Sequence, residues 1–376
     1  MKSDKRISEI DIIKALAIIG MVLGHAGAPF THFIYLFHMA VFFIASGFVY
    51  KNVSTGKIID IWRFVLKKIK QLYVPFVVCN SIFVLLNNLF IDLNIYTDNA
   101  NIFLYVTGEH VSTQNKLGLV DIVKDVLFGF VFKDSTIMGG ALWFLKILFF
   151  VSILYCVFDY IIAKFVHKQI PSCFFQGVIS IVLLAFGFFL STKSIGFFGI
   201  DRIASTYWLY AFGHGLCRFR CLYKNWIWKQ YLLLLVLSFV ALLILNNFGS
   251  ISLNVNYYTN PFFFIISSLF GWCFLYSASY FFTKWFIEKI MIYIGQRTLV
   301  IMMLHFLSFK VVAVLVDLIY NLPAYCIAAF PTLYGNIGFW WIAYTIVGVA
   351  LPLLLDLVFQ TVKDCVFRKR YSNRSY

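Results

Sequence analysis

The chain has 376 residues, of which 62% are hydrophobic, 20% aromatic and only 12% charged. Soluble globular proteins carry about 25% charged residues, so this composition excludes an ordinary soluble protein and indicates a polytopic membrane protein. The formal net charge of +15 is explained mostly by membrane topology, and no nucleic-acid partner is predicted.

The apolar runs predict an all-α protein with ten transmembrane helices. A stretch of about 17 to 25 apolar residues is long enough to cross a bilayer. In chain order the stretches lie near residues 10–28, 33–50, 71–91, 141–163, 174–191, 203–217, 231–247, 261–283, 297–316 and 337–359. We expect residues 1–376 to form a single transmembrane domain, with one long outer loop at 92–140 and a short basic cytoplasmic tail at 360–376.

The positions of lysine and arginine predict the orientation, because cytoplasmic loops carry the excess of these residues. The amino terminus, the loops after even-numbered spans and the carboxyl tail hold 23 of them, and the opposite loops hold five. Both termini are therefore predicted to be cytoplasmic, in a multi-pass protein of the plasma (inner) membrane surrounded by membrane lipids. The basic run of Arg63, Lys67 and Lys68 either reflects topology alone or also binds a polyanion at the inner surface.

The first span contains two ionisable residues, Lys14 and His25. Eleven positions separate them, and at about 100° per residue they return to one helix face, about 16 Å apart along the axis. Asp11 lies three residues before Lys14, where it can pair with the ammonium group. Ionisable residues inside a span usually mark function, so we interpret this stripe as the path of a polar reactant or, alternatively, as a proton relay.

The long outer loop contains a second pattern. Residues 121–132 mix acidic and apolar positions and predict a short interfacial helix ahead of the fourth span. The loop either covers an outer site or is a solvated connector.

Histidines gather at the predicted outer surface. On this topology His25, His32, His38 and His110 fall at or beyond the membrane boundary, and the short loop between the first two spans allows His25 and His38 to lie close together. A neutral imidazole can take a proton from an alcohol or accept an acyl group. The alternative is an interfacial histidine hydrogen-bonded to water or backbone.

Two further ionisable residues lie in the ninth span. His305 needs a partner there, either in a site or in a hydrogen bond between helices, and Lys310 has no explanation in the sequence. The chain has no Walker loop, GxSxG elbow or HExxH motif, so a soluble-type phosphotransferase, serine hydrolase or zinc protease is not indicated. No metal site is predicted.

Several motifs resemble those of the acyltransferase-3 superfamily of integral membrane acyltransferases. Asp11 to His25 has the arrangement D-x-x-K-x10-H, and YLFHMAVFFIASGF is similar to the family's F-H-M-P-x-F-F-x-x-S-G segment. LWFL (142–145) and IGQRTLVIMMLHF (294–306) match two later segments. Many members have arginine at the position of Lys14, and the branch of fucose 4-O-acetylase-like and polysaccharide O-acetyltransferases commonly has lysine. Ala40 replaces a usual proline, and Met302 or Met303 a usual tyrosine.

The resemblance implies transfer of an acetyl or related acyl group from cytoplasmic acyl-CoA, with acetyl-CoA as the expected donor, to a hydroxyl of a cell-surface or exported polysaccharide or its lipid-linked precursor. It implies catalytic roles for His25, Lys14, Asp11 and His38. It implies substrate binding by Trp143, His305, Arg63, Lys67 and Lys68. The leading alternative is a transporter or flippase for a lipid-linked glycan, and the third hypothesis is a non-catalytic membrane assembly protein.

Overall fold

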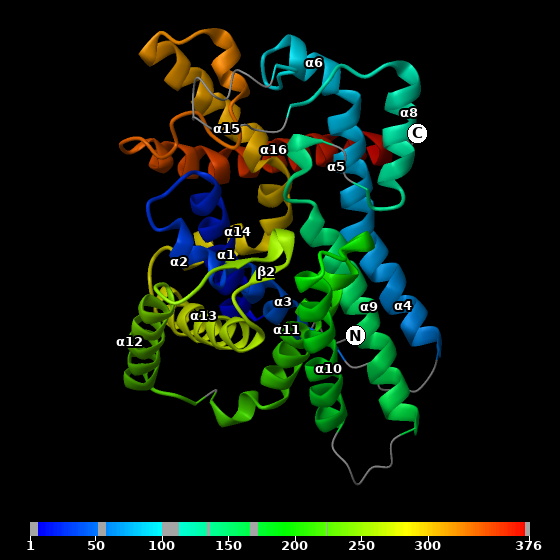
Figure 1. The fold of residues 1–376 in the computed structure, drawn as a ribbon, viewed down its shortest axis with the longest axis vertical. Coiled ribbons are helices and arrows are strands. Elements are labelled where there is room, and N and C mark those ends of the chain that lie inside the picture. Colours follow the sequence, from blue (N-terminus) through cyan, green and yellow to red (C-terminus); the bar gives the residue numbers. More distant parts are fainter. Residues whose placement is uncertain are drawn as a thin grey trace.

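The computed structural model describes residues 7–51, 58–99, 113–133, 136–165, 172–223 and 225–372, and this part of the chain is almost entirely helical (Figure 1). The sole sheet within it is a hairpin of two short antiparallel strands, β1 (Ile251–Ser252) and β2 (Tyr257–Tyr258). The all-α prediction is confirmed.

The helices follow the predicted order. They are α1 (Ser8–His25), α2 (Thr31–Tyr35), α3 (His38–Phe48), α4 (Ile58–Lys68), α5 (Val74–Leu85), α6 (Asn87–Asp92), α8 (Leu119–Gly129), α9 (Trp143–Phe165), α10 (Ser172–Thr192), α11 (Ile200–Arg218), α12 (Trp228–Leu245), α13 (Pro261–Phe282), α14 (Glu288–Gln296), α15 (Thr298–Tyr320) and α16 (Trp340–Ser372).

Each of the ten predicted spans coincides with a helix or a pair of helices. Within the described residues, eight helical segments are long and apolar enough to cross a membrane, so the chain is a multi-pass membrane protein. The remaining two spans are α1 and α11, of 18 and 19 residues. Both carry several charged residues, which makes them harder to recognise as membrane spans from composition alone.

Helix α1 lies at the centre of the molecule. It packs against α3, α13, α14, α15 and α16 (Figure 1), and most of its residues are buried, including Asp11. A helix enclosed by other helices can carry ionisable groups that lipid would exclude. The polar stripe of α1 therefore lies inside the protein.

Glycines allow the helices around α1 to approach one another closely. A side chain at Gly47 of α3 would collide with the backbone of Tyr210 in α11, and one at Gly213 of α11 with the backbone of Ile44. A side chain at Gly295 of α14 would likewise collide with the backbone of Asp11. Small residues at such crossings are typical of membrane helix packing.

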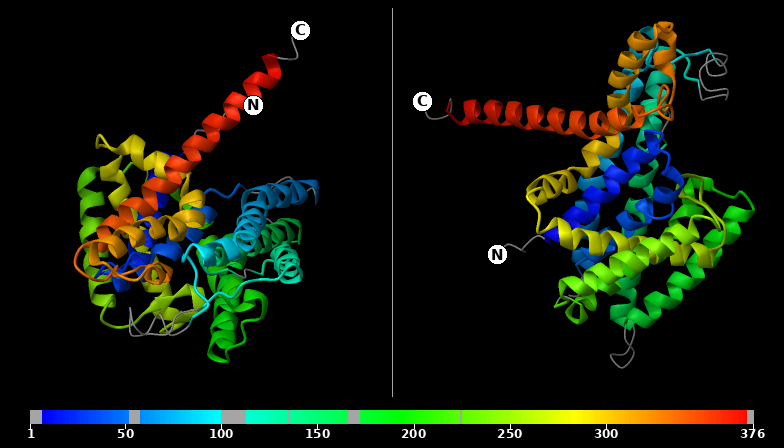
Figure 2. Two further views of the ribbon diagram at one scale, coloured as in Figure 1. Left: turned by 90° about the horizontal axis from the view of Figure 1, so that it is seen from above. Right: turned by 90° about the vertical axis from the view of Figure 1, so that its left-hand side faces the viewer.

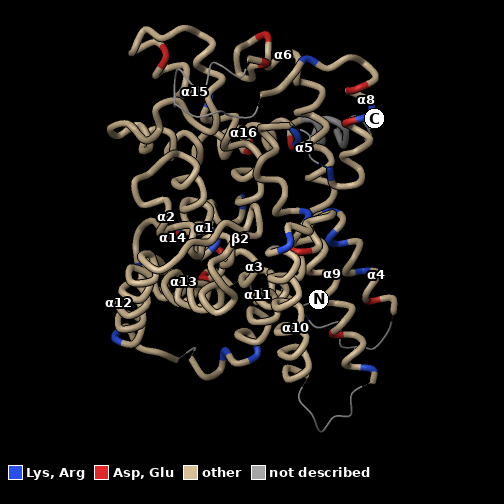
Figure 3. The backbone as a smooth tube through the Cα atoms, viewed as in Figure 1, with Lys and Arg blue, Asp and Glu red and all other residues tan. Residues whose placement is uncertain are grey.

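The third span differs from its predicted bounds of 71–91. Helix α4, a π-helical turn at Ile69–Tyr73 and α5 together cover Ile58–Leu85, so Arg63, Lys67 and Lys68 lie on a helix and not in an extended loop. Twenty-eight residues rise about 42 Å, more than the roughly 30 Å of bilayer hydrocarbon. The helix is therefore long enough for its basic end, α4, to extend beyond the hydrocarbon. Figure 3 shows the lysines and arginines of α4 along the helix.

A helix is present where one was predicted within residues 121–132: α8 covers Leu119–Gly129. Its interfacial position stays a prediction. The hairpin β1–β2, between α12 and α13, was not predicted. His110 and the acidic Glu109 of the long loop lie outside the described residues.

The beginning of α1 and the end of α16 lie on the same side of the molecule (Figure 2, right), as an even number of crossings requires. That this side is cytoplasmic stays a prediction. Helix α16 continues to Ser372, so most of the predicted tail at 360–376 extends the last span as helix.

Lys310, unexplained by the sequence, has a structural role. Its ammonium group is buried and donates to the carbonyl oxygens of Ile327 (2.9 Å) and Ala329 (2.7 Å). It thereby fastens α15 to the segment that follows it.

Lys310→Met is expected to lower the free energy of unfolding by about 2 kcal/mol, because a buried carbonyl without a donor costs about 1–3 kcal/mol. Unfolding in detergent, followed by circular dichroism, measures the change. Lys284→Met, at an exposed position, is the control and is expected to have little effect. A Lys310→Met protein as stable as the parent would contradict this role.

Candidate functional site

A cavity of about 110 Å³ lies at the end of α1 that carries His25. It is enclosed by the ends of α1, α3 and α9, by the segment before α9 and by the chain at 251–254. Its lining residues are Met21, His25, Tyr35, His38, Met39, Gly140, Ala141, Trp143, Ile251, Ser252, Leu253, Asn254 and Met302. We call it the outer cavity. The predicted residues His25, His38 and Trp143 thus line the same cavity.

His25 is held by aromatic neighbours. The hydroxyl oxygen of Tyr35 lies 3.5 Å from its Nδ1. The ring of His305 stacks on it with centroids 5.3 Å apart and planes at 29°, and the ring of Phe306 lies 4.9 Å away. These contacts restrict the imidazole to one orientation at the cavity.

Backbone contacts define the tautomers of the other two histidines. Nδ1 of His38 lies 3.0 Å from the carbonyl oxygen of Ile34, and Nδ1 of His305 lies 2.9 Å from that of Met302. Because a carbonyl only accepts, each Nδ1 carries the hydrogen, and Nε2 of the neutral ring is an acceptor. Nε2 of His305 has no hydrogen-bond partner among the described residues.

The positions of His38 and His305 differ. His38 lines the outer cavity, with its ring 5.0 Å from that of Tyr35. His305 is fully buried, does not line the cavity, and lies behind His25. The geometry therefore favours a supporting role for His305 over the direct substrate contact that the motif suggested.

A second cavity, of about 150 Å³, contains Lys14. Its lining residues are Lys14, Ile18, Met21, Met39, Phe42, Ser46, Gln71, Leu72, Phe144, Leu145, Leu148, Thr298, Leu299 and Met302. We call it the inner cavity. Three methionines, Met21, Met39 and Met302, line both cavities. The two spaces therefore adjoin, and flexible thioether side chains separate them.

Asp11 precedes Lys14 by one helical turn. Its carboxylate accepts from the amide of Gln296, at 3.4 Å, and its backbone packs against Gly295. Asp11 thus joins the start of α1 to α14, and this contact positions the turn that carries Lys14.

The basic residues of α4 differ in exposure. The Arg63 side chain is 74% exposed and pairs with Asp60 at 3.2 Å, and Lys67 is exposed. Lys68 is half-buried, with Nζ 5.3 Å from the centre of the Phe64 ring, and its charge interacts with that of Lys14. Lys68 lies about one helical turn before Gln71 and Leu72, which line the inner cavity.

Several residues of this site were missed at the sequence level. Tyr35, the three shared methionines and the cavity wall at 251–254 were not predicted, and Gln71 lies in the π-helical turn between α4 and α5. Tyr35 carried a usable signal, because it lies three residues before His38 in a helical stretch. The methionines and the hairpin carried none, since apolar residues are common throughout the chain.

His32 lies apart from this site. Its Nδ1 is 2.8 Å from the side-chain oxygen of Asn246, at an exposed position, and it lines neither cavity. It is therefore a natural control for the histidines that do.

Comparison with known proteins gives one match. A family model described as an acyltransferase domain, of the acyltransferase-3 type, matches residues 7–357, which includes both cavities and all residues of the predicted site. No curated protein and no solved structure matches the chain.

Proposed function

The chain belongs to the acyltransferase-3 family, and from this premise we propose that it transfers an acetyl or related acyl group from cytoplasmic acyl-CoA to a hydroxyl of a cell-surface or exported polysaccharide, or of its lipid-linked precursor. Membership in the family supports a membrane O-acyltransferase. The donor, the acceptor and the plasma membrane as location are parts of the proposal.

One observation carries the proposal: the inner cavity with Lys14 adjoins the outer cavity with His25 and His38. Lys14 and His25 lie on one face of α1, about 16 Å apart along its axis. A donor with a long thin arm suits such an arrangement, because its charged end can stay at the inner surface while its reactive end reaches His25.

In the proposed reaction, His25 acts as general base on the acceptor hydroxyl. The Tyr35 oxygen accepts from Nδ1–H of His25, which leaves the lone pair of Nε2 for the hydroxyl proton. The hydroxyl oxygen then forms the ester bond to the acyl carbon, the carbon–sulfur bond breaks, and the proton passes from the imidazole to the leaving thiolate. His38, whose Nε2 is an acceptor, orients the sugar by accepting from a second hydroxyl next to the reacting one.

The inner side is proposed to bind the donor. Lysine and arginine bind phosphate through charge-assisted hydrogen bonds, and Arg63, Lys67 and Lys68 lie on one helix next to the inner cavity. Lys14 is proposed to contact the part of the donor that enters the cavity, and Asp11 to hold the turn that carries Lys14.

The test uses purified protein in lipid with radiolabelled acetyl-CoA and a crude surface-glycan extract from the native host. Label is expected in an ester-linked, alkali-labile glycan product. A folded protein that consumes no thioester in this assay would refute the proposal and favour the transporter hypothesis.

His305→Ala is expected to lower kcat by up to about tenfold with KM for the acceptor unchanged, because an aromatic stack contributes about 0.5–1.5 kcal/mol to holding the ring of His25. His305→Phe keeps a ring in the stack and is expected to restore most of the activity. Steady-state kinetics of both variants measure the effect. Equal losses in the two variants would instead give Nε2 of His305 a direct chemical role.

A further inference from the structure

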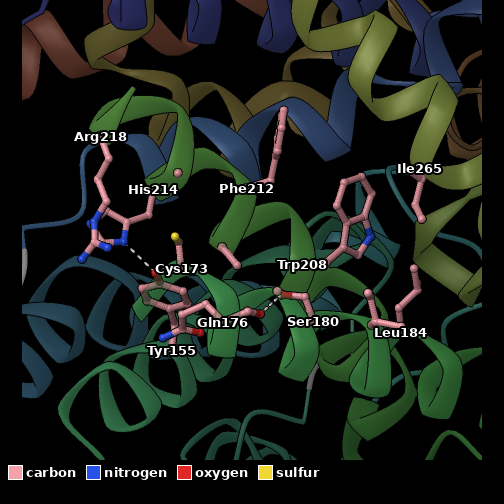
Figure 4. A pocket seen from close by; sticks show the side chains of 14 residues that line it. Tyr155, Cys173, Gln176, Ser180, Leu184, Trp208, Phe212, His214, Arg218 and Ile265 are labelled. Atoms are coloured by element: carbon pink, nitrogen blue, oxygen red, sulfur yellow. Dashed lines mark hydrogen bonds between the residues drawn. The ribbon is translucent and has the colours of Figure 1, made fainter. Parts of the chain in front are cut away.

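A third cavity, of about 260 Å³, lies between α9, α10, α11 and α13 and shares no lining residue with the inner or outer cavity. Figure 4 shows its polar end, with Arg218, His214 and Tyr155, and its apolar end, with Trp208, Leu184 and Ile265. Nothing in the proposed reaction uses it. We call it the lateral cavity.

The chemistry of the lateral cavity changes along its length. Arg218, the last residue of α11, is exposed and donates to Ser172 at the start of α10 (2.7 Å). On the orientation predicted from lysine and arginine, this end lies at the inner membrane surface. The lining residues of α10 continue from Cys173 to Leu184, about 16 Å deeper. A cation at headgroup level above an apolar channel matches the shape and polarity of a membrane lipid.

Two glycines keep the cavity open. A side-chain carbon built at Gly177 or at Gly215 would meet no atom within 4 Å, and both glycines line the cavity. Gly187 on the same helix α10 differs, because a side chain there would collide with Ser205. The space at Gly177 and Gly215 is thus free of protein atoms, whereas the contact at Gly187 is close helix packing.

A buried donor without a partner lies below the polar end. Gln176 is 5% exposed and its side-chain oxygen accepts from Tyr207 at 2.6 Å. Its Nε2 has no partner among the described residues, and leaving such a donor unpaired costs about 1–3 kcal/mol. Gln176 lies one turn, about 6 Å, deeper than the serine that Arg218 contacts. Gln176 lines the cavity, so a rotation of its amide toward the cavity would bring this donor to an acceptor oxygen of a ligand at this depth.

We propose that the lateral cavity binds an anionic glycerophospholipid of the inner leaflet. Its phosphate pairs with Arg218, an ester carbonyl accepts from Nε2 of Gln176, and one acyl chain lies along the apolar wall of Ile181, Leu184, Phe212 and Ile265. A small soluble anion would leave that wall unfilled. A polyprenyl phosphate has no ester carbonyl for Gln176.

The experiment uses the full-length protein in nanodiscs of zwitterionic phospholipid that contain phosphatidylglycerol with a photoreactive group in its acyl chain. After irradiation, labelled peptides are mapped by mass spectrometry. Label is expected in peptides from 172–184 and 208–218. Gly177→Leu, which fills the free space, is expected to remove it, whereas Gly177→Ala keeps it.

Charge is tested separately. Arg218→Gln is expected to lower the label about fivefold, since a basic residue near anionic lipid contributes about 1 kcal/mol, and Lys229→Gln, at an exposed position outside the cavity, leaves it unchanged. Labelling of the lipid-facing helix α12 reports that each variant is folded and embedded.

Three outcomes would overturn the proposal. In the first, α10 and α11 are labelled no more strongly than α12, and Gly177→Leu does not change their labelling. The second is loss of the label in excess acetyl-CoA, which would assign the cavity to the acyl donor. The third is displacement by polyprenyl phosphate at lower concentration than by unlabelled phosphatidylglycerol, which would assign it to a lipid-linked acceptor.

Discussion

Replacement of His25 by alanine is expected to lower kcat for acyl transfer by about 10²- to 10⁴-fold, the usual contribution of a positioned general base. The residue lines the outer cavity and is held there by Tyr35 and His305. Binding of the acyl donor is expected to change little, because we propose that the donor's charged end binds at the basic residues of α4 and at Lys14, away from His25. Initial rates with radiolabelled acetyl-CoA, together with donor binding by equilibrium dialysis, measure both.

His32→Ala is the matched control for this variant. His32 lies in α2, between α1 and α3, but it lines neither cavity and contacts Asn246 instead. Its replacement is expected to leave kcat within about twofold of the parent, since surface changes usually have small effects. If His25→Ala and His32→Ala were equally active, His25 would not be the base.

Lys14→Met is expected to lower kcat/KM for the acyl donor by about 10- to 100-fold. Methionine keeps the length of the side chain and removes its charge, and a hydrogen bond to a charged group contributes about 1.5–3 kcal/mol. Because Lys14 lines the inner cavity, the loss is expected in donor binding or in donor positioning. Steady-state kinetics with varied acetyl-CoA give this ratio.

Lys14→Arg is the companion variant. Many members of the resembled family have arginine at this position, so the charge is expected to be sufficient and at least a tenth of the activity is retained. Met302→Leu, an apolar change of similar volume in the wall of the same cavity, is expected to cost little. A fully active Lys14→Met protein would remove Lys14 from the donor site.

The positions of the spans and of the polar stripe were predictable because they depend on local sequence. Hydrophobic length marks a membrane helix, and the helical period places Lys14 and His25 on one face. The structure agrees with both: the ten spans are helical, and each residue lines one of two adjoining cavities.

The neighbours of His25 across the bundle were not predictable in the same way. His305 lies 280 residues away along the chain and stacks on it, and the hairpin at 251–258 supplies part of the cavity wall. In a membrane protein, faces that meet lipid and faces that meet protein are both apolar. Hydropathy therefore does not identify which helix faces meet. It also gave no signal for the three methionines that line both cavities.

The start of the third helix was not predicted for a related reason. The basic residues of α4 interrupt the apolar run and were assigned to a loop, whereas the helix begins at Ile58 and includes them. Lysine and arginine are good helix formers, and a helix longer than the hydrocarbon core can hold them at its end.

The most direct test of the account is the sidedness of transfer in sealed vesicles. The protein is reconstituted in one orientation, radiolabelled acetyl-CoA is supplied at its cytoplasmic face, and the glycan acceptor is sealed on the opposite side. The account predicts labelled acetyl ester on the sealed acceptor, lost in both His25→Ala and Lys14→Met. Labelling only when donor and acceptor share a side would contradict a route through the two adjoining cavities.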